Sequence, residues 1–361
     1  MGRKVLVVCI DGFGPEYFKL TPMPNLDYMV NSGGMIVGDS VVPTVTNVNN
    51  VSIITGKLPK YHGITSNYWV DRDREKEVYM ESAEFLCCGT VLEKAKNKGL
   101  KTALLTSKKK LLNLLDRGSD YSLSAEDPPP DIVSKLGMAP DIYSPEINHW
   151  LFKALKVVLS EKNPDIIYCS TTDGPMHKFP PEDERSIYHL RKLDELLGKI
   201  VEENPQLQVY VTADHGMSYK SRGIDLQKAL KRKGLKARCL PVIKDSYIVH
   251  HQNLGGASYV FSEKSTGVAE VASALAEIRG VEKVYRREDA CNEFGLMPDR
   301  VGDILVLGER DVVFGEFGSI EVDVSVRSHG SMYERRVPII GYPDFPENCT
   351  NNFDITASLE F

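Results

Sequence analysis

The stretch that decides the fold is Val5-Leu6-Val7-Val8-Cys9-Ile10, a short apolar run that ends at Asp11. Two later runs have the same form and lead into acidic and histidine residues: 165–170 before Asp173 and His177, and 209–213 before Asp214 and His215. Short apolar runs of this kind predict buried strands. In a parallel α/β sheet the site lies at the carboxyl ends of the strands. The sequence therefore predicts carboxylates and imidazoles gathered at one edge of a sheet.

Amphipathic helices alternate with these strands. Apolar spacing with Gly or Pro at the boundaries predicts helices at residues 24–31, 49–55, 90–98, 145–161 and 183–203, and a further strand at 101–105. Strands that alternate with helices are typical of a mainly parallel sheet covered on both faces. We therefore predict an α/β fold with a mainly parallel central sheet flanked by helices.

Two segments interrupt the alternation. Residues 116–141 are rich in Pro, Ser, Asp and Gly, which predicts a loop-rich segment that could join either the core or a cap. Residues 219–321 predict a smaller α+β cap, with helices at 225–233 and 268–278, strand-like runs at 246–250 and 258–261, and a strand pair at 303–307 and 312–314. We expect a metal-binding core formed by residues 1–218 and 322–361, resuming at 323–341, and a cap formed by residues 219–321.

The composition is that of an ordinary soluble globular protein of 361 residues, with 42% hydrophobic and 26% charged residues. The net charge of −6 argues against nucleic acid as a partner, because non-specific binding needs a basic surface. No apolar run approaches the roughly 20 residues of a membrane span, so no membrane partner is expected. The N-terminus only faintly resembles a signal peptide, since its apolar run stops at Asp11 without a small-residue cleavage site.

Cysteine usage points to a reducing compartment. The chain has seven cysteines, an odd number, and no Cys-x-x-Cys pair. Cys9 and Cys169 lie inside predicted strands, where a free thiol packs as a small apolar group. We therefore expect reduced thiols, a cytoplasmic location and no structural zinc on cysteine.

Thr46 comes just before the helix predicted at 49–55. A helix N-terminus offers unpaired N–H groups and the positive end of the helix dipole, which stabilise a phosphate or an ionised hydroxyl. The alternative is that Thr46 or Asn47 only caps the helix, and the local sequence alone favours that alternative.

The remaining candidate ligands are individually weak. Asp173 and His177 stand four residues apart and would face the same way on a helical turn. Asp214 and His215 can both reach one site only where the strand ends and turns, which Gly216 permits, but a surface Asp-His pair is the alternative. His329 is followed by glycine and could be an ordinary loop residue.

Other histidines are weaker candidates still. The helical pattern places His149 and His189 on helix surfaces. His250 and His251, at the end of a strand-like run, are a competing metal or substrate pair.

The joint order Asp, Thr, Asp-x-x-x-His, Asp-His-Gly, His is far more specific than any one part. With this order the chain resembles the alkaline phosphatase superfamily of two-metal hydrolases. Within that superfamily it is similar to the phosphonoacetate hydrolases, with the nucleotide pyrophosphatase/phosphodiesterases as close relatives. The resemblance covers essentially the whole chain, apart from the insertion, and implies an alkaline-phosphatase-like core.

The resemblance also implies a ligand set for two Zn2+ ions, with Mn2+ or Fe2+ as alternatives of overlapping preference. One ion would be held by Asp173, His177 and His329. The other would be held by Asp11, Thr46, Asp214 and His215, with Thr46 as the nucleophile.

Three further matches favour the phosphonoacetate hydrolases. Residues 46–50, Thr-Asn-Val-Asn-Asn, resemble the nucleophile segment of that family, whereas the phosphodiesterases favour Thr-Phe-Pro-Asn. Asn67 matches an asparagine that holds the phosphoryl oxygens, and Lys108 and Lys110 match two lysines that neutralise the substrate. The alternative for the lysines is a solvated surface run, since residues 108–110 are three consecutive lysines.

The implied reaction is hydrolysis of the carbon–phosphorus bond of phosphonoacetate to acetate and phosphate through a phosphothreonine intermediate. The partner would be a small anionic phosphonate, and a homodimer is compatible with the sequence. The alternative enzyme is a nucleotide pyrophosphatase/phosphodiesterase on the same two-metal core. A sulfatase fits less well because the nucleophile position holds Thr. The non-enzymatic alternative is a metal- or phosphonate-binding protein on an inactive core, against which the complete set of candidate ligands counts.

Overall fold

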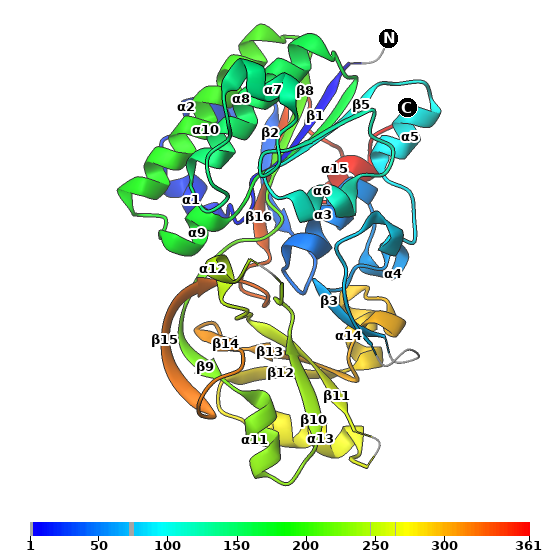
Figure 1. Cartoon of the computed structure of the whole chain (residues 1–361), viewed down its shortest axis with the longest axis vertical. Helices are drawn as coiled ribbons and strands as arrows, with labels where there is room; N and C mark the ends of the chain where they lie inside the picture. Colours follow the sequence, from blue (N-terminus) through cyan, green and yellow to red (C-terminus); the bar gives the residue numbers. More distant parts are fainter. Residues whose placement is uncertain (1–2, 72–75, 246, 264) are drawn as a thin grey trace.

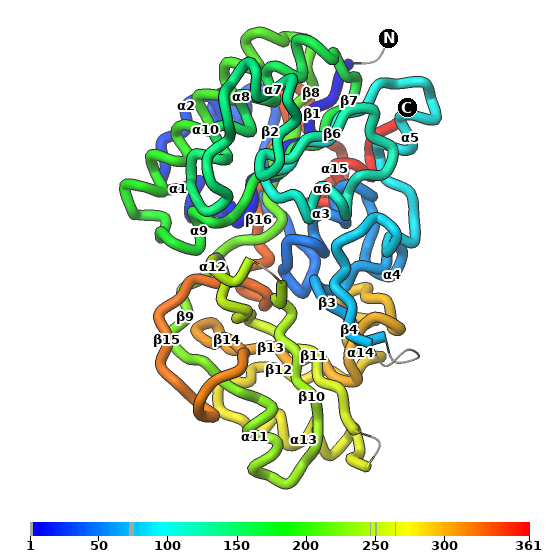
Figure 2. The backbone as a smooth tube through the Cα atoms, in the orientation of Figure 1, coloured from blue at the N-terminus to red at the C-terminus, as the bar shows by residue number. Residues whose placement is uncertain are grey.

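The chain forms two parts, one built on a large sheet covered by helices and the other on smaller sheets (Figure 1). The computed structural model describes residues 3–71, 76–245, 247–263 and 265–361. The smooth backbone trace shows β16 (Arg336–Tyr342) and α12 (Ile248–His251) where the two parts meet (Figure 2). Among the described residues, every helix is too short or too polar for a membrane crossing.

The larger part contains a sheet whose described strands follow the order β2-β16-β8-β1-β7-β5-β6. These strands are β1 (Val5–Cys9), β2 (Gly34–Asp39), β5 (Thr102–Thr106), β6 (Tyr121–Ser124), β7 (Ile166–Ser170), β8 (Gln208–Thr212) and β16 (Arg336–Tyr342). β1, β5, β6, β7 and β8 run parallel, whereas β16 is antiparallel to β2 and β8. The predicted α/β class with a mainly parallel sheet is confirmed.

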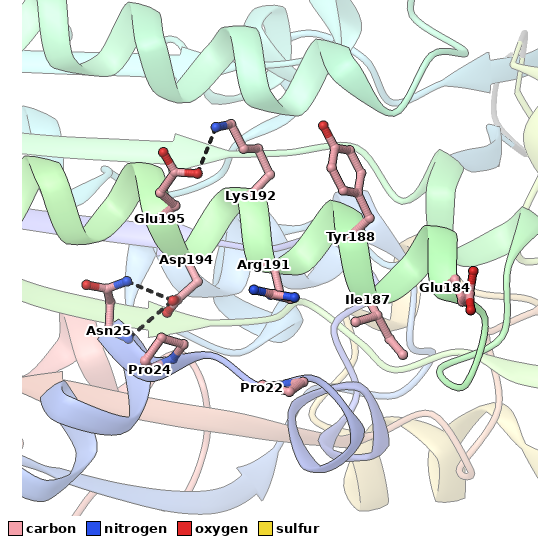
Figure 3. A pocket seen from close by; sticks show the side chains of 10 residues that line it. All are labelled: Pro22, Pro24, Asn25, Glu184, Ile187, Tyr188, Arg191, Lys192, Asp194 and Glu195. Atoms are coloured by element: carbon pink, nitrogen blue, oxygen red, sulfur yellow. Dashed lines mark hydrogen bonds and ion pairs between the residues drawn. The ribbon is translucent and has the colours of Figure 1, made fainter.

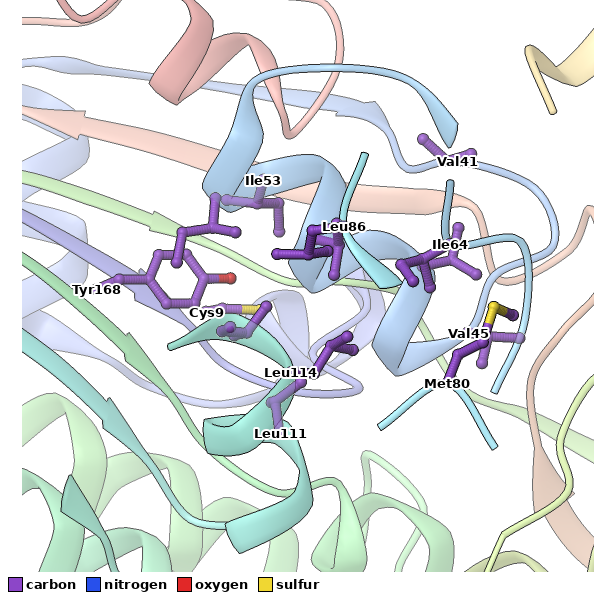
Figure 4. Close-up of a cluster of buried hydrophobic side chains, with 14 of the residues drawn as sticks. Cys9, Val41, Val45, Ile53, Ile64, Met80, Leu86, Leu111, Leu114 and Tyr168 are labelled. Carbon is purple, nitrogen blue, oxygen red and sulfur yellow. The ribbon is translucent and has the colours of Figure 1, made fainter. Parts of the chain in front are cut away.

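The central position of β1 explains its unbroken apolar run. Successive side chains of a strand point to opposite faces of the sheet. Val5, Val7 and Cys9 join one buried cluster, and Leu6 and Val8 join the cluster on the other face. Figure 4 shows Cys9 in the first cluster with Tyr168 of the neighbouring strand β7 and with Leu111 and Leu114 from a helix of that face. Both faces of β1 are therefore covered, which requires apolar residues at every position.

Helices cover both faces of this sheet. On one face lie α1 (Pro15–Leu20), α2 (Pro24–Ser32), α7 (Pro130–Leu136), α8 (Glu146–Glu161), α9 (Gly174–Lys178) and α10 (Glu184–Glu203). On the other lie α3 (Thr46–Thr55), α4 (Pro59–His62), α5 (Val91–Asn97), α6 (Lys109–Leu115) and α15 (Asp354–Ala357). Local signals set several ends: Thr90 and Glu93 form a capping box at α5, and Gly56 ends α3 in the left-handed region at φ 64°.

The smaller part has its own sheets and core. An antiparallel sheet has the order β10 (Ala237–Pro241), β11 (Ala257–Ser262), β13 (Ile304–Gly308) and β12 (Val281–Arg286), and a second has the order β14 (Val312–Phe314), β9 (Ser218–Ile224) and β15 (Glu321–Ser328). α11 (Leu226–Arg232) and α13 (Val268–Ala276) pack on them around a third apolar cluster. The hairpin β3 (Tyr68–Asp71) and β4 (Lys76–Tyr79) and the helix α14 (Arg287–Phe294) lie beside this part.

One strand prediction is wrong, and one segment predicted to be loop-rich contains some regular structure. Residues 116–141 include β6 and α7 between loops, and β6 pairs with β5 at the edge of the central sheet. An edge strand needs fewer apolar residues than a central one, which is why Tyr121-Ser122-Leu123-Ser124 did not stand out. In the run 246–250, Ser246 lies outside the described residues, and residues 248–251 form the helix α12.

The return from the smaller part also differs from the prediction. The residues 312–314 pair with β9 and not with the strand at 304–308. Residues from 323 onward continue β15, which pairs with β9, and the central sheet resumes only at β16. The division into a core of 1–218 with 322–361 and a cap of 219–321 stays a prediction.

Candidate active site

Three neighbouring strands deliver the candidate ligands to one place. Asp11 follows β1, Asp173 follows β7, and Asp214 with His215 follows β8. Because β1 lies between β7 and β8, these side chains converge at the carboxyl edge of the sheet. The three carboxylates are buried, with relative exposures of 0–2%. The sequence prediction of a polar cluster at this edge is confirmed.

Ligand atoms from different parts of the chain lie close enough to share an ion. One oxygen or nitrogen from each of Asp173, His215 and His329 lies within 4.8 Å of the others, and the same holds for Asp11, Asp214 and His215. His177, in α9, places Nε2 at 2.9 Å from Asp173 Oδ2. The rings of His215 and His329 stack with 3.6 Å between centroids. The six side chains are thus brought together, while their division between two ions stays a prediction.

The three imidazoles are oriented as metal-binding histidines usually are. Nδ1 of His177 lies 2.7 Å from Arg327 O, Nδ1 of His215 lies 2.9 Å from Gly216 O, and Nδ1 of His329 lies 2.7 Å from Thr44 O. A carbonyl oxygen only accepts, so each Nδ1 carries the proton. In the neutral ring Nε2 then presents its lone pair to the carboxylates. Lone pairs facing carboxylates fit a divalent cation.

The balance of charge points the same way. Burial and the neighbouring Asp173 and Asp214 raise the pKa of Asp11, and burial raises that of Asp214 to about 7. Burial alone would raise the pKa of Asp173 too, but Lys108 and the adjacent imidazoles hold it well below the usual range. Among the described residues, Asp11 Oδ1 accepts no hydrogen bond. Buried anions of this density require cations, so the residues fit bound metal.

Thr46 does not cap its helix. It is the first residue of α3, which starts earlier than the predicted residue 49, and Val45 occupies the cap position without a side-chain hydrogen bond. The Thr46 hydroxyl lies 3.3 Å from His215 Nε2, so it faces the carboxylate and imidazole cluster. Asn47 donates to Met80 O and does not cap either. The capping alternative is wrong for both residues.

Asn50, which the sequence did not single out, holds the nucleophile candidate and a ligand together. Its Nδ2 donates to Thr46 O at 3.0 Å and to Asp214 Oδ2 at 3.2 Å. Its Oδ1 accepts from Tyr168 Oη and Ser170 Oγ at 2.9 and 2.7 Å. One turn of α3 separates Thr46 from Asn50, so the helix itself sets their spacing. Asn50 is the last residue of the Thr-Asn-Val-Asn-Asn segment, but its role depends on partners from distant parts of the chain.

The three consecutive lysines differ in their burial. Lys108 and Lys110 are buried, whereas Lys109 is exposed. Lys108 Nζ lies 3.1 Å from Asp11 Oδ2 and 2.9 Å from Asp173 Oδ1. Burial alone would lower the pKa of Lys108, but these two carboxylates raise it well above the usual value. The surface-run alternative is therefore wrong for Lys108 and Lys110.

Asn67 and Lys110 meet at a carboxylate that the sequence did not indicate. Asp245 Oδ2 accepts from Asn67 Nδ2 at 2.9 Å and from Lys110 Nζ. Asp245 lies in a loop before α12 with no periodic pattern, so its approach to residues far earlier in the chain had no local signal.

The other histidines correct the sequence analysis. His149 and His189 are buried and not on helix surfaces, and His189 Nδ1 lies 3.0 Å from His149 Nε2. His251 Nε2 lies 2.8 Å from Asp245 Oδ1, and its helical position replaces the predicted strand end.

A surface pocket of about 640 Å³ lies away from this cluster, between the start of α2 and the first half of α10 (Figure 3). Its lining includes Pro24, Tyr188 and Arg191 and none of the candidate ligands. This pocket is therefore separate from the candidate active site, which we locate from the carboxylate and imidazole side chains.

Known proteins are similar to this chain over most of its length. A family model described as type I phosphodiesterase / nucleotide pyrophosphatase matches residues 5–331. The structure of phosphonoacetate hydrolase from Sinorhizobium meliloti, solved with phosphonoacetate, is similar with a TM-score of 0.89 and 31% identity, covering 98% of this chain and 94% of that chain. Its complex with phosphonoformate gives the same values.

More distant relatives share the fold. Murine ectonucleotide pyrophosphatase/phosphodiesterase 5 has a TM-score of 0.74 at 18% identity, covering 98% of this chain and 93% of that chain. Human bis(5'-adenosyl)-triphosphatase ENPP4 is 26% identical over 242 residues, 61% of this chain and 48% of its own length. The chain spans about half the length of the curated relatives it matches.

Proposed function

The chain belongs to the type I phosphodiesterase / nucleotide pyrophosphatase family, and from this premise we propose that it hydrolyses phosphonoacetate to acetate and phosphate. The observation that carries the proposal is the burial of two lysines, of which Lys108 contacts Asp11 and Asp173 in the cluster and Lys110 contacts Asp245. A small trianionic substrate in an acidic protein needs such a local cationic site. The likeness to phosphonoacetate hydrolase over 98% of the chain supports the same substrate.

We propose two Zn2+ ions as the cofactors. One would be held by Asp173, His177 and His329, and the other by Asp11, Thr46, Asp214 and His215. Carboxylate and imidazole ligands suit zinc, and Mn2+ or Fe2+ have overlapping preferences. When bound, the ions would supply charge to the phosphoryl oxygens and favour the ionised Thr46 hydroxyl.

The chain's own residues account for the rest of the reaction. Thr46 Oγ1 loses its proton to solvent and attacks phosphorus, and the new O–P bond forms as the C–P bond breaks. The bonding pair passes to the carbon next to the substrate carboxylate, which gives an enolate-like dianion that takes a proton to become acetate. Lys108 and Lys110 stabilise the charge on that carboxylate, and Asn67 donates to a phosphoryl oxygen. Water then hydrolyses the phosphothreonine to phosphate and regenerates Thr46.

The second candidate function is hydrolysis of nucleotide or other phosphoesters on the same cluster. The family model and the ENPP4 relatives favour it, because both are named for nucleotide substrates. A nucleotide diester would require an aromatic slot for its base, whereas phosphonoacetate requires cations.

The experiment that separates the two candidates is phosphate release from phosphonoacetate by zinc-loaded protein, beside metal-stripped protein and hydrolysis of 4-nitrophenyl phenylphosphonate. Zinc-dependent release from phosphonoacetate supports the proposal. Brisk hydrolysis of the ester with little release from phosphonoacetate would move the protein to the phosphodiesterases. A cytoplasmic location also stays a proposal, which the unpaired cysteines support.

A further inference from the structure

Asp245 lies beside the proposed substrate residues and accepts from four donors. Its side chain is 4% exposed, and each oxygen accepts from two donors. Oδ2 accepts from Lys110 Nζ and from Asn67 Nδ2 at 2.9 Å. Oδ1 accepts from Tyr247 N at 2.7 Å and from His251 Nε2 at 2.8 Å. The carboxylate therefore joins the loop before α12 to α6 and to the segment just before β3.

The tautomer of His251 is fixed by this arrangement. His251 Nδ1 accepts from Asn253 N at 3.0 Å, and a backbone N–H can only donate. The proton of the neutral ring is therefore on Nε2, where it is donated to Asp245. Asn253 Oδ1 in turn accepts from Asp245 N at 3.1 Å. Tyr247, His251 and Asn253 thus hold Asp245 from its own stretch of the chain.

The same carboxylate limits what Lys110 and Asn67 can do. A lysine side chain is long and flexible, but Lys110 Nζ is held between Asp245 and the ring of Tyr247, 4.8 Å from the ring centroid. A carboxylate accepts only, so its contact with Asn67 Nδ2 sets the orientation of that amide and leaves its second N–H for another acceptor.

We propose that Asp245 is a positioning residue that fixes Lys110 and Asn67 for recognition of a phosphonate bearing a carboxylate. This inference rests on the proposed function. A buried anion next to an anionic substrate is unfavourable on charge alone, and the four donors are what stabilise the Asp245 carboxylate there. Geometry held in this way matters because a misplacement of about 1 Å can cost about 100-fold in rate.

The test is Asp245→Asn, which keeps the size of the side chain but leaves one oxygen for four donors. We expect kcat/KM for phosphonoacetate to fall about 10- to 100-fold, and to fall more than kcat/KM for 4-nitrophenyl phenylphosphonate, which has no carboxylate. In a Lys110→Ala background the same change should lower the ratio of the two values little further, because residues acting as a unit are not additive.

Asp194→Asn is the matched control. Asp194 is also buried, at 2% exposure, and accepts from Leu26 N at 2.7 Å and Asn25 Nδ2 at 2.8 Å, between α10 and α2. Its loss should lower stability without changing the ratio of the two substrates. If Asp245→Asn lowers both activities equally, as a merely structural change would, or if its effect adds in full to Lys110→Ala, the inference is overturned.

A second measurement separates this inference from the proposed function. Phosphonoacetate should raise the melting temperature of the zinc-loaded wild type. The rise should be smaller in Asp245→Asn and as large as in the wild type in Asp194→Asn. A wild type that phosphonoacetate stabilises without phosphate release would refute the proposed function, and the melting comparison then decides the inference. A wild type that shows neither effect would refute both.

Discussion

His62 should make the folded protein sensitive to acid. The ring is buried beside Ser52, with Nε2 at 2.9 Å from Ser52 Oγ, and Nδ1 accepts from Ile64 N at 3.1 Å. Because that N–H only donates, a second proton on Nδ1 would face another donor. Burial, with a smaller effect of Arg300, lowers the pKa of His62 to about 3. The folded state therefore keeps this ring neutral well below neutral pH.

The size of the effect follows from the two states. The unfolded ring has a pKa of about 6.5, so between about pH 6.5 and pH 3 the unfolded chain binds the proton that the folded chain excludes. The free energy of unfolding then rises with pH, and it falls on acidification from about pH 6.5 down to about pH 3. At about pH 5.5 the loss from His62 is about 1.4 kcal/mol, and at about pH 4.5 it is about 2.7 kcal/mol.

Urea unfolding of metal-stripped protein near neutral pH and at about pH 5.5 measures this loss. Between the two conditions the wild type should lose about 1.4 kcal/mol more than His62→Gln. Thr55→Val is the control on the same helix, since Thr55 Oγ1 donates to Val51 O at 2.7 Å and has no proton to gain. The free energy of unfolding of Thr55→Val should fall by as much as that of the wild type. Equal losses in the wild type and His62→Gln would refute the assignment of a neutral buried ring.

Four further outcomes are expected. Thr46→Ala should lower phosphate release by about 10⁴-fold or more, and full activity would remove Thr46 as the nucleophile. Lys110→Ala should lower phosphonoacetate turnover about 100-fold and ester turnover less. Lys109→Ala, at an exposed position, should change neither activity. Equal losses of both activities in Lys110→Ala would contradict the role of Lys110. Asn50→Ala should cost about 3 kcal/mol in urea unfolding, because Tyr168, Ser170 and Asp214 lose their partner. Removal of metal by a chelator should lower the melting temperature, and an unchanged value would argue against a bound ion.

The strands and their terminal ligands could be predicted because their signals are local. An apolar run such as Val5–Cys9 has to be buried on both faces, and the residue after a parallel strand falls at the site edge. Helix limits were also local, since Thr90 and Glu93 cap α5 through their own side chains. These features need no knowledge of the rest of the chain.

The partners of buried polar groups could not be predicted in this way. Lys108 reads locally as part of a solvated run, and only Asp11 and Asp173, distant in sequence, make its burial favourable. His149 and His189 looked exposed because each is polar on an amphipathic helix, yet the two rings contact each other inside the fold. Asp245 has no periodic neighbours, so nothing local connects it with Lys110.

The strand order also determines when the chain can fold during synthesis. β2 joins the central sheet only through β16, so residues 34–39 have no sheet partner among the described strands until residues 336–342 have been made. Closing so long a loop is slow, and contacts between such distant residues reduce folding rates. His329 also arrives near the end, close before β16. The cluster of carboxylates and imidazoles is therefore completed late, almost at the same time as the sheet that carries it.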